Sequence, residues 1–373
     1  MHTLNLGILA HVDAGKTSLT ERLLYAAGVI GEVGSVDDGS TQTDTLALER
    51  QRGITIKSAV VSFTIGGVTV NLIDTPGHPD FIAEVERVLG VLDGAVLVIS
   101  AVEGVQAQTR ILMRALRRLR IPVLIFVNKI DRRGARGAAV LAEITARLGV
   151  TAVPMGVPDG LGTRAASVTP LRPADPGGAE RLAAVLAEHD DGLLAAYLAD
   201  PAAIGAGRLR RALAAQTAAA QVCPAYFGSA ITGAGTGELA DGIARLLPAA
   251  SGDPAGPLSG TVFKVERGPG GEKIACARLF SGTVATRGRL SYGDTEDKVT
   301  AIGVYDGGPA ARRPLASAGQ IARLWGLAGV RIGDTLGAPP PGRPAAGGNF
   351  APPTLETVVV PDRPADMGAL HAA

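Results

Sequence analysis

Cysteine is scarce in this chain of 373 residues, which contains two, Cys223 and Cys276. Two cysteines cannot form a disulfide framework, and they suit a reducing compartment such as the cytosol. The cysteines and histidines also lack the spacing that is typical of a zinc site. These absences exclude a small domain stabilised by disulfides or by zinc. We expect a cytoplasmic protein.

Long apolar runs and an excess of one charge are missing too. The apolar runs are short, such as 121–127, so no membrane helix is expected, and residues 1–5 lack the basic region of a secretory signal. The chain carries 36 basic and 35 acidic side chains, a net charge of +1. A stand-alone, non-specific nucleic-acid binder is therefore disfavoured, because that affinity needs many contacts to phosphates. Docking on a nucleoprotein through a local patch stays open.

The chain does contain an alternation of apolar runs and amphipathic helical patterns. Such alternation predicts an α/β fold with a mostly parallel sheet covered on both faces, and such sheets bind ligands at the carboxyl ends of their strands. The expected strands are 4–10, 58–65, 68–74, 95–100, 122–128 and 222–228. The expected helices are 17–26, one with Phe81, Val85, Val88, Leu89 and Leu92 on one face, 179–187 and 208–220.

The length predicts two or three domains. We expect residues 1–250 to form the first, with an Ala-rich insert at about 132–220. After a Gly- and Pro-rich linker, short β-runs separated by glycine turns predict a small β-barrel at 257–337. Residues 350–373 are expected to be the truncated start of a third domain, beginning with a strand at 355–360. The expected barrel strands are 260–265, 273–279, 299–304 and 320–325.

A phosphate-loop pattern lies between the first strand and the first helix, with Ala10 in place of the usual first glycine. Backbone N–H groups and a helix N-terminus can hold phosphate oxygens. Lys16 is expected to reach the β- and γ-phosphates and to serve catalysis, and the Thr17 hydroxyl to bind Mg²⁺. The residues assigned to the nucleotide here are Ala10, His11, Val12, Asp13, Ala14, Gly15, Lys16, Thr17 and Ser18.

A second loop follows the strand that ends at Asp74. Asp74 can hold Mg²⁺ through a water, and the Gly77 amide can contact the γ-phosphate because glycine lets backbone approach closely. His78, beside it, is interpreted as the residue that orients the attacking water, although a packed or capping histidine is the alternative. The residues assigned to the nucleotide in this loop are Asp74, Thr75, Pro76, Gly77 and His78.

Two further strand ends predict selectivity for guanine. The Asp131 carboxylate can accept two hydrogen bonds from the edge of guanine, a pair that adenine does not offer, so discrimination of about 10⁴ or more is accessible. The Lys129 stem can lie along the base. Backbone amides of the later loop can donate to the guanine carbonyl. The residues assigned to the base are Asn128, Lys129, Asp131, Gly228, Ser229 and Ala230.

A polar stretch at 31–50 leads into residues 52–56, RGITI, and is expected to be ordered by GTP and released on hydrolysis. Thr55 is placed on Mg²⁺, which makes Thr17, Thr55 and Asp74 the predicted metal ligands. No arginine finger is evident, so slow intrinsic hydrolysis is expected, with about 10³–10⁵-fold activation by a partner. The basic stripe on the helix at 107–118 indicates a solvated face or, alternatively, a face toward RNA. Its members are Arg110, Arg114, Arg117 and Arg118.

Together these motifs resemble the translational GTPases, and segments 280–283 and 333–336 resemble the barrel of elongation factors G and Tu, their domain II. Within that family the chain is most similar to the tetracycline-resistance ribosomal protection proteins of the Tet(M) and Otr(A) type. The segments that carry this resemblance are 34–37, 43–44, 48–53, 104–110 and 350–353.

The resemblance implies a Mg²⁺-dependent GTPase that binds GTP and GDP and docks on the ribosome, on its RNA and proteins. Such a factor releases tetracycline and leaves after hydrolysis; it is expected to be monomeric and to continue through further domains. The resemblance also implies that Asp13 helps to hold a monovalent cation. Two alternatives remain, namely a truncated GTP-binding module without resistance activity and an elongation factor G-like translocation factor. The stretch 106–110 argues against the second.

Overall fold

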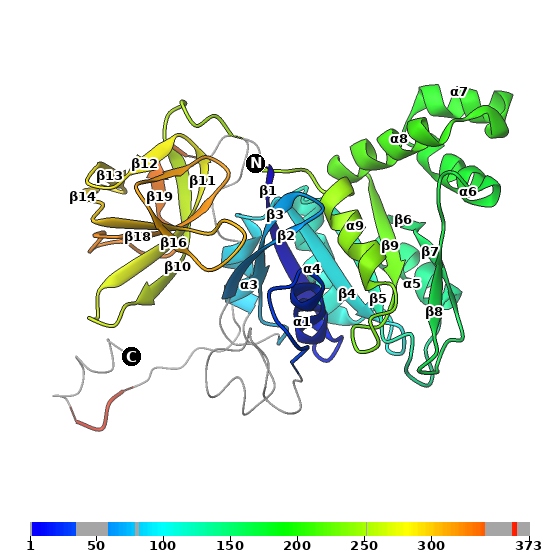
Figure 1. Cartoon of the computed structure of the whole chain (residues 1–373), viewed down its shortest axis with the longest axis horizontal. Helices are drawn as coiled ribbons and strands as arrows, with labels where there is room; N and C mark the ends of the chain where they lie inside the picture. The colour runs from blue at the N-terminus through cyan, green and yellow to red at the C-terminus, as the bar shows by residue number, and fades with distance from the viewer. Residues whose placement is uncertain (1, 35–58, 79–81, 251, 340–359, 364–373) are drawn as a thin grey trace.

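A computed structural model of the chain describes residues 2–34, 59–78, 82–250, 252–339 and 360–363. Figure 1 shows an α/β domain whose helices flank a twisted sheet, with a separate β-barrel at one end and a group of helices at the other. The predicted fold class, a mostly parallel α/β domain followed by a small barrel, is confirmed.

The main sheet has the strand order β2-β3-β1-β4-β5-β9-β6. The hairpin partners β2 and β3 are antiparallel, whereas the other neighbouring pairs are parallel. The strands are near-continuous apolar runs because both faces are covered. Their bounds are β1 (His2–Ala10), β2 (Ala59–Ile65), β3 (Val68–Asp74), β4 (Gly94–Ser100), β5 (Val123–Asn128), β6 (Thr151–Pro154) and β9 (Val222–Phe227).

Helices cover the two faces of this sheet with separate apolar cores. Alternate residues of a strand point to opposite faces, so Val96 of β4 joins the core under α1 and α9, whereas Leu97 joins the core under α3, α4 and α5. The bounds are α1 (Lys16–Ala26), α3 (Ile82–Leu89), α4 (Ala107–Arg118), α5 (Ala138–Leu148) and α9 (Thr236–Leu246).

Residues 132–220 contain more structure than the sequence pattern indicated. Helix α5 packs on the main sheet, and β6 is the edge strand of that sheet, paired with β9. Three further helices form a small core around Leu186 and Leu209 together with residues of β6 and β9. The expected helices 179–187 and 208–220 are observed with shifted ends. The bounds are β7 (Gly156–Asp159), β8 (Ser167–Pro170), α6 (Pro176–Ala187), α7 (Asp191–Ala199), a 3-10 helix η2 (Pro201–Ala203) and α8 (Ala206–Ala218).

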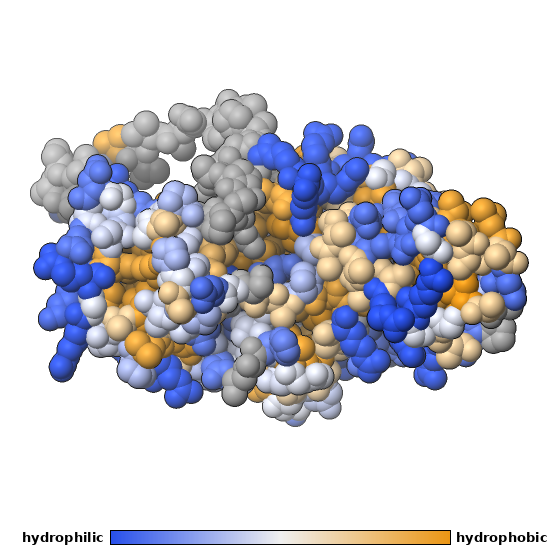
Figure 2. Space-filling view, turned by 90° about the horizontal axis from the view of Figure 1, so that it is seen from above, coloured by the Kyte–Doolittle hydropathy of each residue, from blue (hydrophilic) through white to orange (hydrophobic). Residues whose placement is uncertain are grey.

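The surface of the helical end carries apolar side chains. Seen from above, apolar colour gathers at that end of the molecule (Figure 2), and on α7 the side chains of Leu194 and Leu198 are exposed. In the part of the chain that the structure describes, every helix is too short or too polar to cross a membrane.

The second domain is an antiparallel barrel. Its main sheet has the order β14-β13-β19-β10-β11-β18-β15-β16, and β12 pairs with β17 beside it. Val262, Leu279 and Leu324 lie in its apolar core. The bounds are β10 (Ser259–Arg267), β11 (Lys273–Ser281), β12 (Thr283–Ala285), β13 (Arg289–Tyr292), β14 (Thr295–Lys298), β15 (Ala301–Val304), β16 (Ala311–Arg313), β17 (Leu315–Ser317), β18 (Ile321–Trp325) and β19 (Thr335–Gly337).

The two domains are joined by a buried polar contact. Arg278 of β11 is 1% exposed and forms an ion pair with Asp93, which precedes β4, at 3.0 Å. Its guanidinium also donates to the Gly319 carbonyl. From β1, the backbone amide and the side-chain amide of Asn5 both donate to the second oxygen of Asp93, at 2.9 and 2.6 Å. The barrel is therefore docked on the same strands whose far ends carry the candidate site.

Candidate functional site

The predicted loops follow strands whose carboxyl ends lie side by side in the main sheet. Asp74, at the end of β3, is paired with Ile8 near the end of β1, and Ser100, at the end of β4, is paired with Asn128 at the end of β5. Val127 lies beside Phe227. The turns that follow these strands are therefore neighbours in space, although long stretches of chain separate them.

The phosphate loop is held in an unusual backbone conformation. Gly15 has a φ of 91°, in the left-handed region, and an added Cβ would lie 2.3 Å from the Asn128 side-chain nitrogen, so a larger residue would break this turn. Asp13 is also left-handed, with a φ of 61°. The N-terminus of α1 has no side-chain cap and no acidic residue in its first turn. Backbone N–H groups at such a helix N-terminus suit an anion.

Lys16 and Asp74 form a buried ion pair at the base of this loop. Lys16 Nζ lies 2.5 Å from Asp74 Oδ1, and the two side chains are 7% and 0% exposed. The pair joins the first residue of α1 to the carboxylate at the end of β3. A polyphosphate that reached Lys16 would compete with Asp74 for its ammonium group.

The donor set around this pair fits Mg²⁺. The ion prefers oxygen ligands and is usually bound through one or two protein groups, waters and substrate phosphates, and Thr17 and Asp74 supply a hydroxyl and a carboxylate. Within the described ranges no group of three or more His, Cys, Asp or Glu side chains could hold a metal ion, so the ion would depend on nucleotide oxygens as well. The third predicted ligand, Thr55, lies outside the described residues.

The 75–78 turn lies against the phosphate loop. A Cβ added at Gly77 would sit 3.7 Å from the Ala10 carbonyl oxygen, and the Thr75 hydroxyl donates to the Ile8 carbonyl at 2.9 Å. The Gly77 carbonyl in turn accepts a hydrogen bond from the Gln108 side chain at 2.6 Å. The sequence analysis missed Gln108, whose signal was its place in the 104–110 stretch directly after a strand end. His78 is half-buried at the end of this turn.

Asn128 connects the phosphate loop with the base-side loops. Its side-chain nitrogen donates to the Ala14 carbonyl at 2.8 Å, and its side-chain oxygen accepts from the Ala230 amide at 2.9 Å. The next residue, Lys129, has a φ of 68°, a left-handed conformation that costs a non-glycine residue energy and is enriched at functional sites. Asp131 is half-buried two residues further on.

The amides of 228–230 bond within the chain, which the sequence analysis did not expect. Gly228 N donates to Val127 O at 3.0 Å and Ser229 N to Ala234 O at 2.9 Å, while Ala230 N donates to Asn128. A guanine carbonyl would therefore have to share the Ala230 amide with Asn128. Arg22, another residue missed from the sequence, supports this loop, because its Nε donates to the Ala230 carbonyl at 2.9 Å.

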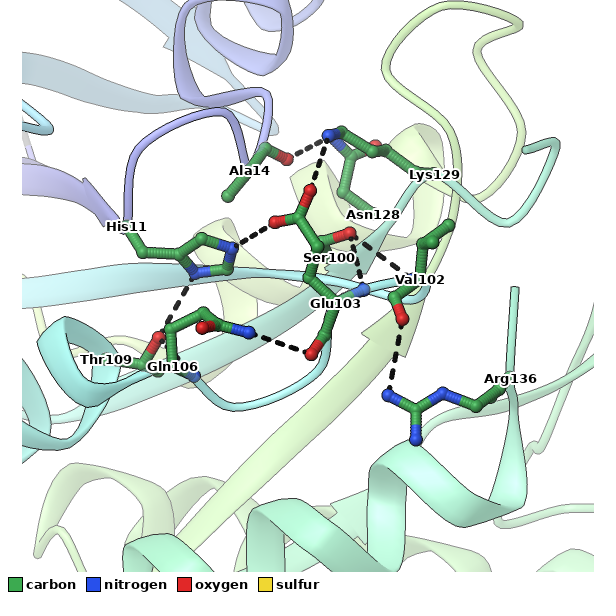
Figure 3. Close-up of polar contacts among 10 residues, drawn as sticks. All are labelled: His11, Ala14, Ser100, Val102, Glu103, Gln106, Thr109, Asn128, Lys129 and Arg136. Atoms are coloured by element: carbon green, nitrogen blue, oxygen red, sulfur yellow. Dashed lines mark hydrogen bonds and ion pairs between the residues drawn. The ribbon is translucent and has the colours of Figure 1, made fainter. Parts of the chain in front are cut away.

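A polar cluster lies beside the phosphate loop (Figure 3). His11 Nδ1 lies 3.1 Å from the Thr109 hydroxyl and His11 Nε2 lies 3.0 Å from Glu103 Oε2. Burial lowers the pKa of His11 below its usual 6.5, against the raising effect of Glu103. His11 is therefore neutral at pH 7, and its contact with Glu103 is a hydrogen bond. The carboxylate accepts from Nε2–H, which leaves Nδ1 to accept from the Thr109 hydroxyl.

The arginines of the predicted basic stripe lie on the exposed side of α4. Their exposure is what both a solvated face and a face toward RNA require. Arg117 also donates to the Leu148 carbonyl at 3.3 Å, which ties α4 to the end of α5.

Comparison with known proteins identifies the family. The model of the elongation factor Tu GTP-binding domain matches residues 1–249. The chain belongs to this family. The predicted membership of the translational GTPases is thereby confirmed.

Among curated proteins, this translational GTPase is similar to tetracycline resistance proteins, as its motifs predicted. It is 54% identical to the oxytetracycline resistance protein of Streptomyces rimosus, over all of this chain and 58% of that protein. It is 49% identical to tetracycline resistance protein TetM of Streptomyces lividans, with the same coverage of 100% and 58%. The chain therefore spans somewhat more than half the length of these relatives.

A solved structure from Thermus thermophilus shares the fold. Its TM-score is 0.80 at 24% sequence identity, and the match covers 99% of this chain and 59% of the other. This likeness supports the arrangement of an α/β domain followed by a barrel, independently of the sequence motifs.

Proposed function

We propose that the chain binds GTP and hydrolyses it to GDP and phosphate in a Mg²⁺-dependent reaction, as the N-terminal part of a ribosomal protection factor that acts in the cytoplasm. The observation that carries the proposal is the buried Lys16–Asp74 pair at the base of an uncapped helix N-terminus. A buried cation at a helix N-terminus without a side-chain cap is suited to a polyphosphate. The family match supports the choice of GTP.

The residues then have distinct tasks. The α1 amides and Lys16 hold the phosphates, and the Gly77 amide contacts the γ-phosphate. His78 orients the water that attacks the γ-phosphorus, so that catalysis rests on positioning. Thr17, Asp74 and, as a prediction outside the described residues, Thr55 would hold Mg²⁺, which when bound neutralises charge on the phosphate oxygens.

Base selection is assigned to the opposite side of the pocket. Asp131 accepts two hydrogen bonds from guanine, and the Lys129 stem lies along the base. The left-handed Lys129 backbone and the Asn128 bridge to the phosphate loop support this assignment, because they place the base-side loop in a fixed relation to the phosphates.

The ribosome is the proposed partner, and release of tetracycline the proposed role of the full-length protein. The support is the identity to named tetracycline resistance proteins over the whole of this chain. Because the chain spans 58% of those proteins, a GTP-binding module without resistance activity is the second candidate. Expression in a sensitive host separates the two: a raised inhibitory concentration of tetracycline supports protection, and an unchanged one supports the module.

Calorimetry and phosphate release test the enzymatic proposal. GDP and GTP should bind in the presence of Mg²⁺ and ADP should not, and phosphate release from GTP should rise when ribosomes are added. Absence of guanine nucleotide binding by a folded sample, or equal binding of ADP, contradicts the proposal. Removal of Mg²⁺ with a chelator should abolish turnover.

Two variants test the assigned roles separately. His78→Ala should retain GTP affinity and lose about 10²–10⁴-fold in turnover, the range for a positioned proton-transfer or water-orienting group; unchanged turnover would remove His78 from the chemistry. Asp131→Asn should shift preference from guanine to xanthine nucleotides, because the xanthine C2 oxygen would then meet an N–H donor. Retained guanine preference would contradict the base assignment.

A further inference from the structure

Glu103 occupies a fixed turn between two elements of the candidate site. It follows β4 and precedes α4, and its backbone amide donates to the Ser100 hydroxyl at 3.2 Å. Its carbonyl accepts from the Gln106 side chain at 2.9 Å. The Ser100 side chain is fully buried. The buried Ser100 hydroxyl therefore holds the Glu103 backbone, with the exposed Gln106 side chain as a lesser contact, and the Glu103 side chain is 41% exposed.

The Glu103 carboxylate lies between His11 and Lys129, two residues of the candidate site (Figure 3). One oxygen, Oε2, accepts a hydrogen bond from His11 of the phosphate loop at 3.0 Å. The other, Oε1, lies 3.7 Å from the Lys129 ammonium group. One side chain from a third loop thus contacts a residue of the phosphate loop and a residue of the base-side loop.

The two contacts act on residues whose position matters. His11 is 5% exposed and is also hydrogen-bonded to Thr109, so it is clamped between Glu103 and α4. Lys129 has a strained backbone and a long side chain with many rotamers, whose ordering has an entropic cost. A fixed carboxylate beside its ammonium group favours one of those rotamers before any ligand arrives, which is pre-organisation in the usual sense.

We propose that Glu103 is a positioning residue: it holds the phosphate loop and the base-contacting Lys129 in the relative position that guanine nucleotides need. The inference rests on the proposed GTP-binding function and adds a residue that no nucleotide motif contains. Glu103 does not contact the nucleotide. It acts through His11 and Lys129, and its effect is on nucleotide affinity and dissociation rate.

Glu103→Gln tests the proposal with a side chain of the same shape. The glutamine oxygen can accept a hydrogen bond from His11 only if its NH₂ group faces Lys129, and it can accept one from Lys129 only if its NH₂ group faces His11. One of the two contacts is therefore lost. The GDP dissociation constant should rise about 3- to 10-fold, a moderate effect because the carboxylate is partly exposed to water. The change should lie mainly in the dissociation rate, measured with a fluorescent GDP analogue by stopped flow.

A double-mutant cycle shows whether the effect passes through Lys129. Lys129→Met retains the apolar stem and removes the charge. The combined effect of Glu103→Gln and Lys129→Met on GDP affinity should be at least about threefold smaller than the product of the single effects, since contacting residues are not additive. Multiplicative effects would overturn the proposal.

Gln106→Ala is the matched control. It removes the side-chain bond to the Glu103 carbonyl and weakens the start of α4, but it touches neither His11 nor Lys129. It should lower the melting temperature as much as Glu103→Gln or more, and leave GDP affinity within about twofold. A parallel loss of affinity in both variants would reduce Glu103 to a structural residue. If the unaltered chain bound no GDP, the proposed function itself would fail; normal GDP binding by Glu103→Gln would contradict this inference alone.

Discussion

Two buried ion pairs in this molecule have opposite surroundings. Lys16 and Asp74 meet beneath the uncapped N-terminus of α1, where a polyphosphate would compete for the lysine. Arg278 and Asp93 meet between the two domains, where Asn5 donates hydrogen bonds to Asp93 and the Gly319 carbonyl accepts one from Arg278. In the first pair a phosphate would replace Asp74 as the partner of Lys16, whereas in the second pair Arg278 and Asp93 would stay together.

The difference shows why burial of a charge does not reveal its purpose. Removing one partner of a buried pair is costly in either place, because the remaining charge stays desolvated. Around Arg278 the protein supplies the other partners itself. Lys16 begins a helix whose N-terminus has no side-chain cap, and a phosphate is a ligand suited to that position. The surroundings of a pair, more than the pair, separate a binding site from a structural contact.

Lys16→Met should give the largest effect, a loss of nucleotide affinity. The methionine retains the apolar stem and loses the charged hydrogen bonds to two phosphates, each worth about 1.5–3 kcal/mol. The affinity for a non-hydrolysable GTP analogue, which carries both the β- and the γ-phosphate, should fall on the order of 10²- to 10⁴-fold. Calorimetry measures the loss, and an affinity within tenfold of the unaltered chain would contradict the exchange of partners.

Arg278→Met should lower stability and spare the nucleotide site. It leaves Asp93 buried beside an apolar side chain, which should cost about 3–5 kcal/mol in the free energy of unfolding, measured by urea denaturation. GDP affinity should stay within about twofold, since the pair lies at the other end of the strands. Arg289→Met is the control: its pair with Glu296 is exposed, at 73% and 45%, and should contribute less than about 1 kcal/mol. Equal losses in both variants would refute the special role of the buried pair.

Asn5→Ala should give a smaller loss at the same interface. It removes a side-chain hydrogen bond to Asp93 and one to the Gly319 carbonyl at 3.2 Å, but leaves the Arg278 charge in place. The free energy of unfolding should fall by about 1–3 kcal/mol. In a double-mutant cycle with Arg278→Met the two losses should be less than additive; additive losses would mean that the two side chains do not share one network.

The smallest effect should come from pH. Burial lowers the pKa of His11 below the 6.5 of the free side chain, so below that value the unfolded chain takes up a proton more readily than the folded one. His11 therefore contributes stability that is present above pH 6.5 and is lost as the pH falls. Urea denaturation between pH 7.5 and 5.5 should show a steeper decline in the unaltered chain than in His11→Gln. Parallel curves would contradict the assignment of a neutral, buried His11.

The sequence predicted most strands and helices of the first domain along the chain, because apolar runs and helical periods are local signals. Strands at 4–10 and 122–128 were expected and lie within a residue or two of β1 and β5. The strand β6 was not predicted, because a four-residue strand in a Pro- and Gly-rich stretch has too few residues to show an apolar pattern. That strand exists because it pairs with β9, a partner far away along the chain.

The motifs themselves were readable from sequence since each occupies a few consecutive residues. Their contacts were not. Arg22, Glu103 and Gln108 support three different loops of the site, yet none belongs to a nucleotide motif. Each meets its loop through the fold, because helices α1 and α4 pass beside strand ends distant in the chain.

The sequence by itself determined the family and the fold class, and it predicted the residues of the nucleotide loops, because spacing along a chain is enough to encode a turn between a strand and a helix. The tertiary structure decided which charges face one another. It brought Lys16 to Asp74 and Arg278 to Asp93, and it turned the Ala230 amide toward Asn128. Such pairings depend on strand order and side-chain packing, which act across distances that no local pattern encodes.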